Sequence, residues 1–597
     1  MSNITIGRII EKLRQEKNYS RKKLSQGLCS TQMLIKIENN ESDVDKFMSD
    51  ILLQRLGKSP DKLEIIISNE EYRKIHIRDE IEELIWKRKR DEAEKLLSEY
   101  EVQYAKDSYV QKMYILRTKA YMSQELDGNS VKAESYIRQA IEVTLPGIKI
   151  EKMDEYLLAT IELENVLELG YVVLQQGRIQ EAEGIFANCY KYVESNVTDE
   201  VEYTKIISKI AWLSSLVYIR KQEYENAYGL CESAFEKMRK YGNLYFMMPL
   251  LEQLLVCCEK LGREERKKKY QIFYRMIKEL YQQYGEDWYC QNSIFHNCCQ
   301  TAYHLTGEFI RQERQAKKMT QEQLIEGVYE EPENLSRVEN GKEMPSRKKF
   351  EGLMRNLGIE RGKYCGTLVV EDFEILELKY EIDILIGAGK YEEAQCKLSE
   401  LENMIDCEER VNDMALKIYH TSIKLSMELS TGRADVKTIG QKLKTLLESS
   451  GLLLDGKIYR VPFFNEMAAL NMLGICLKRA GKRQEAIALY EDIINCIEEI
   501  VIDEKYQNDI LSPILANLDL YDSKRELGRK GISYELGCGK GKMIYMHIIA
   551  QLELTDDKNA KQEMTRLAYY FSELYYMETN KQRIKKYYEK TYGEIIE

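Results

Sequence analysis

The feature that most constrains how this chain can fold is a repeat within its own sequence. The segment GRIIEKLRQEKNYSRKKLSQGL at 7–28 recurs as GEFIRQERQAKKMTQEQLIEGV at 307–328. One residue is then inserted and the register holds, so that DEAEKLLSEYE at 91–101 matches EEAQCKLSELE at 392–402, an offset of 301 positions. Matches at so steady an offset are hard to obtain by chance. They predict a tandem duplication of a unit about half as long as the chain.

Composition narrows the class of fold. The chain has 597 residues, too many for one ordinary hydrophobic core, and 44% of them are hydrophobic. Only 7 prolines and 33 glycines interrupt it. Because these residues are the strongest breaks in regular structure, their scarcity beside frequent Leu, Glu, Lys and Ile favours long helices. We predict an all-α protein of several domains.

Charge and hydropathy limit which partners and which cellular compartment can be expected. The net charge of −11 argues against a uniformly basic surface, although it is compatible with a small basic module on an acidic body. The most apolar windows, such as IAWLSSLVYI at 210–219, are much shorter than the roughly 18 residues of a membrane-spanning helix. The first residues have no apolar core of signal-peptide length, and the 14 cysteines are scattered like reduced thiols. We expect a cytoplasmic protein with no membrane partner.

Most of each half has the pattern of paired helices. LNMLGICLKRAGKRQEAIALYEDII at 470–494 has apolar residues three and four positions apart, a turn at Gly481, and a small residue, Ala486, where a second helix must pack closely. This pattern resembles the tetratricopeptide repeat, whose helix pairs stack into a right-handed superhelix with a concave binding face. The resemblance predicts such repeats over 68–304 and 367–597. The 42 tyrosines fit either packed helix faces or a peptide-binding concave surface.

The head of each half has several short helices separated by capping residues. The apolar stripe of the first helix consists of Ile6, Ile9, Ile10 and Leu13. Ser20 is placed to cap a short second helix and Ser30 to cap a third, with Gly27 permitting a tight turn between them. Two further short helices are predicted around Phe47 and over 51–56. Two short helices joined by a tight turn within an apolar bundle are typical of a helix-turn-helix.

Both heads resemble the Cro/repressor-like (Xre) family, most clearly in MTQEQLIEG and LSRVENGKEMPS of the second copy. The resemblance predicts helix-turn-helix domains at 1–67 and 305–366. It implies that the third helix lies in the major groove of double-stranded DNA while the start of the second touches phosphate. Carried over residue by residue, it places Arg21 and Lys22 on the DNA backbone and Ser30, Thr31, Gln32 and Lys36 in the groove. Gln32 is best placed to contact an adenine edge.

The second head carries carboxylates at the corresponding surface. The matching positions are Gln321 and Glu322, then Glu331, Pro332, Glu333, Asn334 and Arg337. Several carboxylates beside phosphate are repulsive, although an acidic start also suits the positive end of a helix dipole. Two interpretations stay open: Gln321, Asn334 and Arg337 contact an unusual DNA site, or this head is a dimerisation or packing element.

Few residues have a spacing suited to metal binding or catalysis. His296, Cys298, Cys299 and His304 lie close in sequence, but neighbouring cysteines on a helix point about 100° apart, so buried thiols on a packed helix are expected. LGCGKGKM at 536–543 lacks the strand and the Ser or Thr of a phosphate loop, and it aligns with the turn MRKYGNLYF. The five histidines show no catalytic order. We predict no enzyme activity, no metal and no cofactor.

A Cro/repressor-like head followed by tetratricopeptide-like repeats resembles the peptide-pheromone-responsive regulators of Gram-positive bacteria. The resemblance implies a transcriptional regulator in quorum sensing, whose solenoid binds a signalling peptide or protein and thereby changes how the DNA-binding modules are held. Asn165 and Asn471 are candidates for contacts with a peptide backbone. The alternative is a scaffold whose repeats hold partner proteins and whose heads no longer bind DNA.

Two expectations concern assembly. Helix-turn-helix regulators usually dimerise to read two half-sites about one helical turn apart. The chain is therefore expected to form a homodimer, or to act as an intrachain pseudo-dimer. The junction at 291–315 has no linker rich in Pro, Gly or Ser, so the second head is expected to grow directly out of the preceding repeat.

Overall fold

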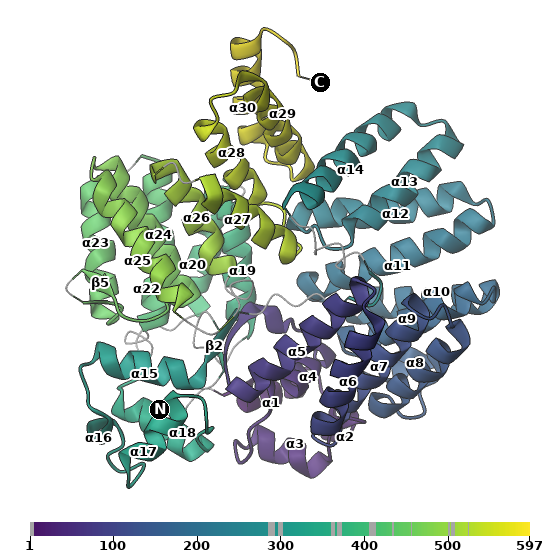
Figure 1. Ribbon diagram of the computed structural model, residues 1–597, viewed down its shortest axis with the longest axis horizontal. Coiled ribbons are helices and arrows are strands. Elements are labelled where there is room, and N and C mark those ends of the chain that lie inside the picture. The colour runs from purple at the N-terminus through teal and green to yellow at the C-terminus, as the bar shows by residue number, and fades with distance from the viewer. Residues whose placement is uncertain are drawn as a thin grey trace.

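The computed structural model describes the chain except for residues 1–4, 285–292, 297–301, 360–363, 367–372, 388, 405–413, 433–434, 455, 500–501, 503–507, 523–524 and 597. The described part is almost entirely helical, which confirms the predicted class. Two modules of short helices lie side by side at one end, and an array of longer paired helices extends from each (Figure 1). None of the described helices combines the length and apolar character needed to cross a membrane.

The first module consists of four helices and a strand. They are α1 (Ile6–Glu16), α2 (Arg21–Ser25), α3 (Thr31–Glu38), α4 (Lys46–Arg55), a 3-10 turn (Pro60–Lys62) and β1 (Leu63–Ile67). Side-chain oxygens of Ser20 and Ser30 accept hydrogen bonds from the first turns of α2 and α3, as predicted. The two short helices predicted around Phe47 and over 51–56 are instead one helix, α4, because Asp45 caps it and no glycine or proline breaks it.

The first solenoid follows as successive pairs of packed helices. They are α5 (Asn69–Trp86), α6 (Arg90–Tyr104), α7 (Tyr109–Glu125), α8 (Ser130–Thr144), α9 (Thr160–Gln175), α10 (Ile179–Asn196), α11 (Glu200–Arg220), α12 (Tyr224–Tyr241), α13 (Met247–Leu261) and α14 (Glu264–Tyr284), with a 3-10 segment at Ile150–Glu155. A Cβ on Gly170 of α9 would lie 2.4 Å from the Phe186 ring of α10. Only glycine therefore lets these two helices approach so closely.

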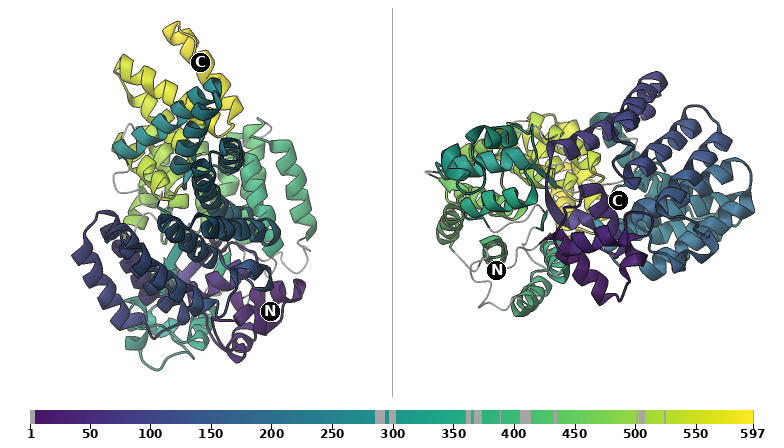
Figure 2. Two further views of the ribbon diagram at one scale, coloured as in Figure 1. Left: turned by 90° about the vertical axis from the view of Figure 1, so that its right-hand side faces the viewer. Right: turned by 90° about the horizontal axis from the view of Figure 1, so that it is seen from below.

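The second module has the same order of short helices. They are α15 (Thr306–Ala316), α16 (Gln321–Leu324), α17 (Pro332–Glu339) and α18 (Arg347–Asn356). Strand β2 (Ala302–Leu305) precedes the module, and β3 (Tyr364–Gly366) follows it. The two modules also lie next to each other in the view from below (Figure 2).

The second solenoid again consists of successive helices packed on one another. They are α19 (Phe373–Gly387), α20 (Tyr391–Met404), α22 (Met414–Ser430), α23 (Val436–Ser449), α24 (Phe464–Arg479), α25 (Arg483–Glu498), α26 (Asn508–Asp522), α27 (Arg525–Gly537), α28 (Ile544–Leu554), α29 (Lys558–Leu574) and α30 (Glu578–Tyr592), with a small hairpin of β4 (Leu453–Leu454) and β5 (Lys457–Ile458). Gly481 has a positive φ of 79° and Ala486 is fully buried, as the sequence predicts for this hairpin. A Cβ on Gly474 would lie 2.4 Å from the Tyr490 ring, the same close approach as at Gly170.

A three-stranded sheet joins the two modules, and it was not expected from the sequence. Strand β1 is central, parallel to β2 and antiparallel to β3. The expectation that the second module grows directly out of a helical repeat is therefore wrong, because the chain enters that module through β2. In the antiparallel pair, Glu64 lies opposite Cys365, and these two residues are 301 positions apart. This pairing relates β1 and β3 by a local two-fold axis.

A second contact of the same kind lies at the far end of the solenoids. Asn243 pairs with Lys540 in an antiparallel bridge. The Leu244 amide donates to the Gly539 carbonyl at 2.7 Å, and the Gly541 amide donates to the Gly242 carbonyl at 2.8 Å. The turns that hold these residues are the ones that the sequence aligns. The described ends of both solenoids, α12 to α14 and α27 to α30, share one hydrophobic core around this point.

Candidate nucleic-acid interface

The α2–turn–α3 unit of the first module has a buried side and an exposed side. Leu24, Leu28 and Leu34 are buried against the rest of the module. Gly27 takes a left-handed φ of 72°, which turns the chain between the two helices at little steric cost. The unit lies at the outer edge of the molecule (Figure 1). Its outward face is thus free for a partner.

The structure places most of the predicted DNA contacts on this outward face. The exposed side chains are those of Lys22, Ser30, Thr31, Gln32 and Lys36. The Ser30 hydroxyl oxygen accepts a hydrogen bond from the Met33 amide at 3.1 Å, and a hydroxyl that accepts can still donate its own hydrogen. The N-cap of α3 can therefore present a donor, and the first two turns of the helix carry the other groove candidates, Thr31, Gln32 and Lys36.

Arg21 is placed differently from the other candidates. Its Nε donates to Glu38 Oε2 at 2.6 Å, and one terminal nitrogen lies 3.7 Å from Glu11 Oε1. The side chain is only about one-third exposed, at 35%. Arg21 can reach a phosphate only with part of its guanidinium, because two carboxylates already hold the rest.

Glu38 organises a charged network under this surface. Its carboxylate is fully buried and accepts hydrogen bonds from Arg14 Nε at 2.6 Å and from a terminal nitrogen of Arg14 at 2.9 Å. This hydrogen bonding raises the pKa of Arg14 above its ordinary value, so the guanidinium stays charged. Paired fork-to-fork bonds of this kind fix geometry as well as charge. The network ties α1, α2 and α3 together and holds the outward face in place.

The second module repeats the network with one change. Arg314 donates to both oxygens of Glu339, at 2.6 Å and 3.0 Å, and Gln321 donates to Glu339 at 2.7 Å. Gln321 thus stands where the first module has Arg21, and it is engaged inside the module. The sequence signal for this network is the recurrence of Arg14 and Glu38 as Arg314 and Glu339.

The outward face of the second module is acidic. Exposed carboxylates surround α16 and α17, and they belong to Glu322, Glu326, Glu330, Glu331 and Glu333. Arg337 is exposed and lies 3.3 Å from Glu343, and Asn334 is half-buried. Residues 1–67 have 12 Lys and Arg against 9 Asp and Glu, whereas residues 305–366 have 12 against 11. The difference in charge is concentrated on the face that would meet DNA.

Arg55 is one of the side chains that dock the first module on its solenoid, and Gln54, Ser59 and Lys62 make further links to Glu202 and Asp199 at the start of α11. The guanidinium donates to both oxygens of Glu162 on α9, at 2.6 Å and 2.9 Å, and to the Thr144 carbonyl at 3.0 Å. It also donates to the Leu24 and Gln26 carbonyls of its own module. Among the described residues, Asn356, 301 positions later, makes the module-internal pair of bonds alone, to the Leu324 and Glu326 carbonyls, both at 2.8 Å.

Gly27 and Gly327 offer a matched test of this docking. Both have positive φ, 72° and 70°, but a Cβ on Gly27 would lie 2.0 Å from the Thr144 carbonyl oxygen, whereas a Cβ on Gly327 would meet nothing within 4 Å. Each Gly→Ala change should cost about 1–2 kcal/mol for the left-handed conformation. Only Gly27→Ala should also displace the module from the solenoid, so its thermal unfolding temperature should fall further. Equal losses for the two variants would contradict the docking.

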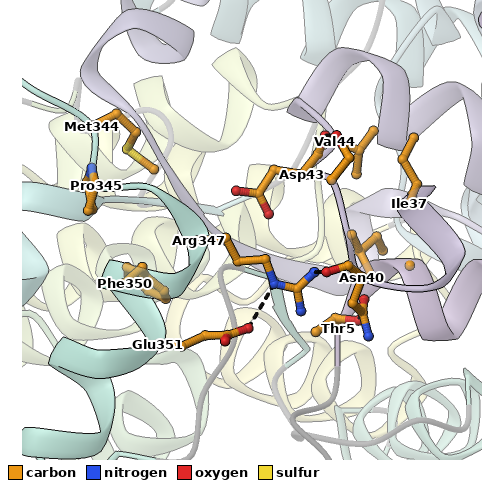
Figure 3. A pocket seen from close by; sticks show the side chains of 13 residues that line it. Thr5, Ile37, Asn40, Asp43, Val44, Met344, Pro345, Arg347, Phe350 and Glu351 are labelled. Atoms are coloured by element: carbon orange, nitrogen blue, oxygen red, sulfur yellow. Dashed lines mark hydrogen bonds and ion pairs between the residues drawn. The ribbon is translucent and has the colours of Figure 1, made fainter. Parts of the chain in front are cut away.

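The two modules touch through the loop that precedes the fourth helix of each. A terminal nitrogen of Arg347 donates to the Asn40 carbonyl at 2.5 Å, and Nε donates to Glu351 at 2.8 Å (Figure 3). Val44 and Pro345, also 301 positions apart, line the same pocket from opposite sides. The second module therefore supports the first module by packing against it, on a side away from the outward face of α3.

The residues weighed for metal or phosphate binding have structural roles where they are described. His304 lies buried on β2 with its ring 4.5 Å from that of Phe463, and Cys298 and Cys299 fall outside the described residues. Within the described part, no group of three or more His, Cys, Asp or Glu side chains is arranged to hold a metal ion. The turn at 536–543 is an inter-helix turn whose Gly541 amide is already bonded to Gly242.

Of the two candidate peptide contacts, Asn471 is engaged within the protein. Its side-chain oxygen accepts from the Tyr490 hydroxyl at 3.1 Å and from the Asn517 amide at 2.8 Å. Asn165 is fully buried, and its amide makes no hydrogen bond within the described part of the chain. Neither placement assigns a ligand, and both residues stay candidates.

Comparison with known proteins decides the class of the first module. Residues 10–63 match the family model described as helix-turn-helix. Residues 10–63 are a helix-turn-helix domain. No curated protein matches the chain significantly.

Several solved structures are similar to about half of the chain. They include Bacillus thuringiensis PlcR in complex with the peptide PapR7 and DNA (18% identity, 47% of this chain and 98% of that chain, TM-score 0.30). ComR from S. thermophilus, in complex with DNA and its signalling peptide ComS, is 17% identical over 47% of this chain and 98% of that chain, with a TM-score of 0.27. The Streptococcus dysgalactiae SHP pheromone receptor Rgg2 is 16% identical over 48% and 99%, with a TM-score of 0.24. Similarity of this degree assigns no ligand to this chain.

Proposed function

We propose that the chain is a DNA-binding transcriptional regulator whose first helix-turn-helix domain, residues 1–67, contacts duplex DNA through α3. The observation that carries the proposal is the joint exposure of Ser30, Thr31, Gln32 and Lys36 on a helix held by the Glu38 network. A glutamine amide matches the donor and acceptor pattern of adenine in the major groove. Lys22 and the exposed part of Arg21 lie at the start of α2, where their positive charge would meet phosphate.

The rest of the proposal concerns the organisation of the chain. We propose tetratricopeptide-like solenoids at 68–304 and 367–597, a second helix-turn-helix domain at 305–366, and an origin by tandem duplication. The two local two-fold contacts, Glu64 with Cys365 and Asn243 with Lys540, support an intrachain pseudo-dimer in architecture, in which the second domain is a packing element and not a second DNA reader. Homodimers of helix-turn-helix proteins obtain the same arrangement from two chains.

We propose that the second domain positions the first and contributes little to DNA binding. Its outward face carries the carboxylates of Glu322, Glu331 and Glu333, which oppose phosphate, while its Gln321 is held by Glu339. Footprinting on a selected site tests this role. One protected half-site per chain is expected. Two protected half-sites a helical turn apart would show that Asn334 and Arg337 contact DNA as well.

The solenoids are proposed to sense a ligand, which is a peptide or a protein. A ligand can change the DNA-binding arrangement only by its difference in affinity between two conformations. Arg55 joins α4 to α9, so a shift of α9 would be transmitted to the first domain.

Retention of fragmented genomic DNA by the purified chain, followed by sequencing, identifies the site. On that site, Lys22→Ala should weaken binding to all sequences alike and reduce the slope of log K against log salt by about 0.9, the value for one lost phosphate contact. Gln32→Ala should instead cost about 1–3 kcal/mol and relax the preference at one base pair. The exposed Lys348 of the second domain provides the control, and Lys348→Ala should leave the slope unchanged.

The scaffold alternative predicts a different result. Under it, binding to duplex DNA would be negligible and insensitive to salt in the unaltered chain. Neither Lys22→Ala nor Gln32→Ala would then have an effect, and the DNA-binding proposal would be abandoned.

A further inference from the structure

A short segment of the connector between the two halves is buried in the first solenoid. Residues 293–296, Ser-Ile-Phe-His, follow the end of α14 in sequence, yet they lie against helices α5, α7, α9 and α11. These are the first helices of four successive helix pairs. Ile294 and Phe295 belong to the hydrophobic core of that solenoid. The segment therefore crosses the repeats, as a bound peptide would.

The Phe295 side chain occupies an aromatic slot. Its ring stacks on Tyr121 of α7 with centroids 4.6 Å apart and an interplanar angle of 16°, and it meets Tyr171 of α9 edge-on at 6.3 Å. Only 3% of Phe295 is exposed. Aromatic pairs in these geometries add specific attraction to the area that they bury.

The backbone of the segment is held by two side chains of the solenoid. Lys209 Nζ on α11 donates to the Ile294 carbonyl at 3.1 Å and to the His296 carbonyl at 2.6 Å. The Tyr245 hydroxyl donates to the same His296 carbonyl at 2.8 Å. Lys209 is fully buried, and Glu164 accepts its third hydrogen bond at 2.6 Å. Among the described residues, two of the three hydrogen bonds of this buried ammonium go to the segment, so without the segment those two donors would lose their acceptors.

The charges around His296 favour a basic residue at this last position of the segment. His296 Nδ1 lies 2.6 Å from Glu82 Oε1 of α5. The charged side chains of the solenoid at this site are Glu82, Arg117, Glu164, Glu168 and Lys209. Three of the five are carboxylates and two are cations, so a basic residue at the position of His296 balances the set.

These features do not recur in the second half. At the offset of 304 that relates Gly170 to Gly474, Glu164 corresponds to Ala468 and Glu168 to Met472. The carboxylates that hold Lys209 and Arg117 are thus replaced by apolar side chains. The site is a property of the first solenoid and not of the repeat unit in general.

We propose that the inner face of the first solenoid is a peptide-binding site that the chain's own residues 293–296 occupy in cis, and that an external peptide with an aromatic residue followed by a basic one must displace them. The proposal rests on the proposed function only in taking the solenoid as the sensor. His296 precedes β2 by six positions, a reach of at most about 20 Å. Displacement would therefore act on the strand that pairs with β1, next to both modules.

The test measures peptide affinity in the full chain without DNA, so that a chain that binds no DNA still tests it. The probe is a labelled, end-blocked hexapeptide with the sequence of residues 292–297, Asn-Ser-Ile-Phe-His-Asn. A tethered competitor acts at an effective concentration of about 1 mM, so Phe295→Ala should bind the probe at least roughly tenfold more tightly than the unaltered chain. Adding Lys209→Met to Phe295→Ala should remove that gain.

A matched control and a milder variant complete the design. Lys221, at the end of α11, pairs with Glu183 on the surface, and Lys221→Met added to Phe295→Ala should leave the gain intact. His296→Ser keeps the Phe295 ring in its slot and should give a smaller gain in affinity for the probe. If Phe295→Ala does not fold, the affinity of His296→Ser for the probe is the deciding measurement. Folded variants that bind the probe no better than the unaltered chain, or a gain that survives Lys209→Met, would overturn the proposal.

Discussion

Replacing Arg55 with asparagine is expected to uncouple the first helix-turn-helix domain from the first solenoid. Arg55 is 4% exposed and Glu162 is fully buried, and their two hydrogen bonds are the main polar link between α4 and α9. Breaking a buried ion pair by removing one partner costs about 3–5 kcal/mol, because the other charge stays buried. Asparagine is chosen because Asn356 shows that it can still serve the module-internal carbonyls.

The expected signature of Arg55→Asn is a separate, earlier unfolding transition for the first domain. Hydrogen exchange of the amides in α1 to α4 should accelerate while exchange in α15 to α18 stays unchanged. DNA affinity should be retained, whereas any response of DNA binding to a solenoid ligand should be lost. Asn356→Ala is the control, with an expected cost of about 1 kcal/mol for each neutral hydrogen bond lost. One transition at the original temperature would show that Arg55 does not carry the coupling.

Replacing Glu38 with alanine should have the other large effect, loss of the first domain's fold. The change leaves the Arg14 guanidinium buried without its carboxylate and releases Arg21. A loss of about 3–5 kcal/mol is expected. That is a large share of the roughly 5–15 kcal/mol that stabilises a typical domain. DNA binding should disappear, and circular dichroism and hydrogen exchange should locate the loss of structure in α1 to α4.

Glu339→Ala is the matched comparison for Glu38→Ala. In the second domain the carboxylate faces one cation, Arg314, and the neutral Gln321, so fewer charges lose their partner. A smaller loss is expected, confined to α15 to α18, with DNA affinity changed little. Glu38→Gln separates charge from shape, because it keeps the volume and one acceptor oxygen. Unfolding of Glu38→Ala at the temperature of the unaltered chain would refute the structural role of the network.

The sequence by itself determined the helical class, the capping residues and the hairpins. Ser20 and Ser30 cap their helices, and Gly481 and Ala486 form a hairpin, because caps, turns and helical periodicity depend on residues within a few positions of one another. The helix-turn-helix at 10–63 has the same local origin, so the positions of its outward residues follow from the spacing of its apolar and capping residues.

Only the tertiary structure decided how the two halves contact each other and which charged side chains form ion pairs. Strand β1 pairs with segments that lie more than two hundred positions away, and the burial of LEIII alone does not distinguish a strand from a core helix. Arg21 was assigned to phosphate from its position, yet Glu38 holds it from another helix. Residues 293–296 show no pattern of their own in the sequence. Their role is visible only from their contacts with Lys209 and Tyr121. Backbone pairing and ion pairing across such separations depend on the whole fold, because the spacing of residues in the sequence carries no record of which distant segment supplies the partner.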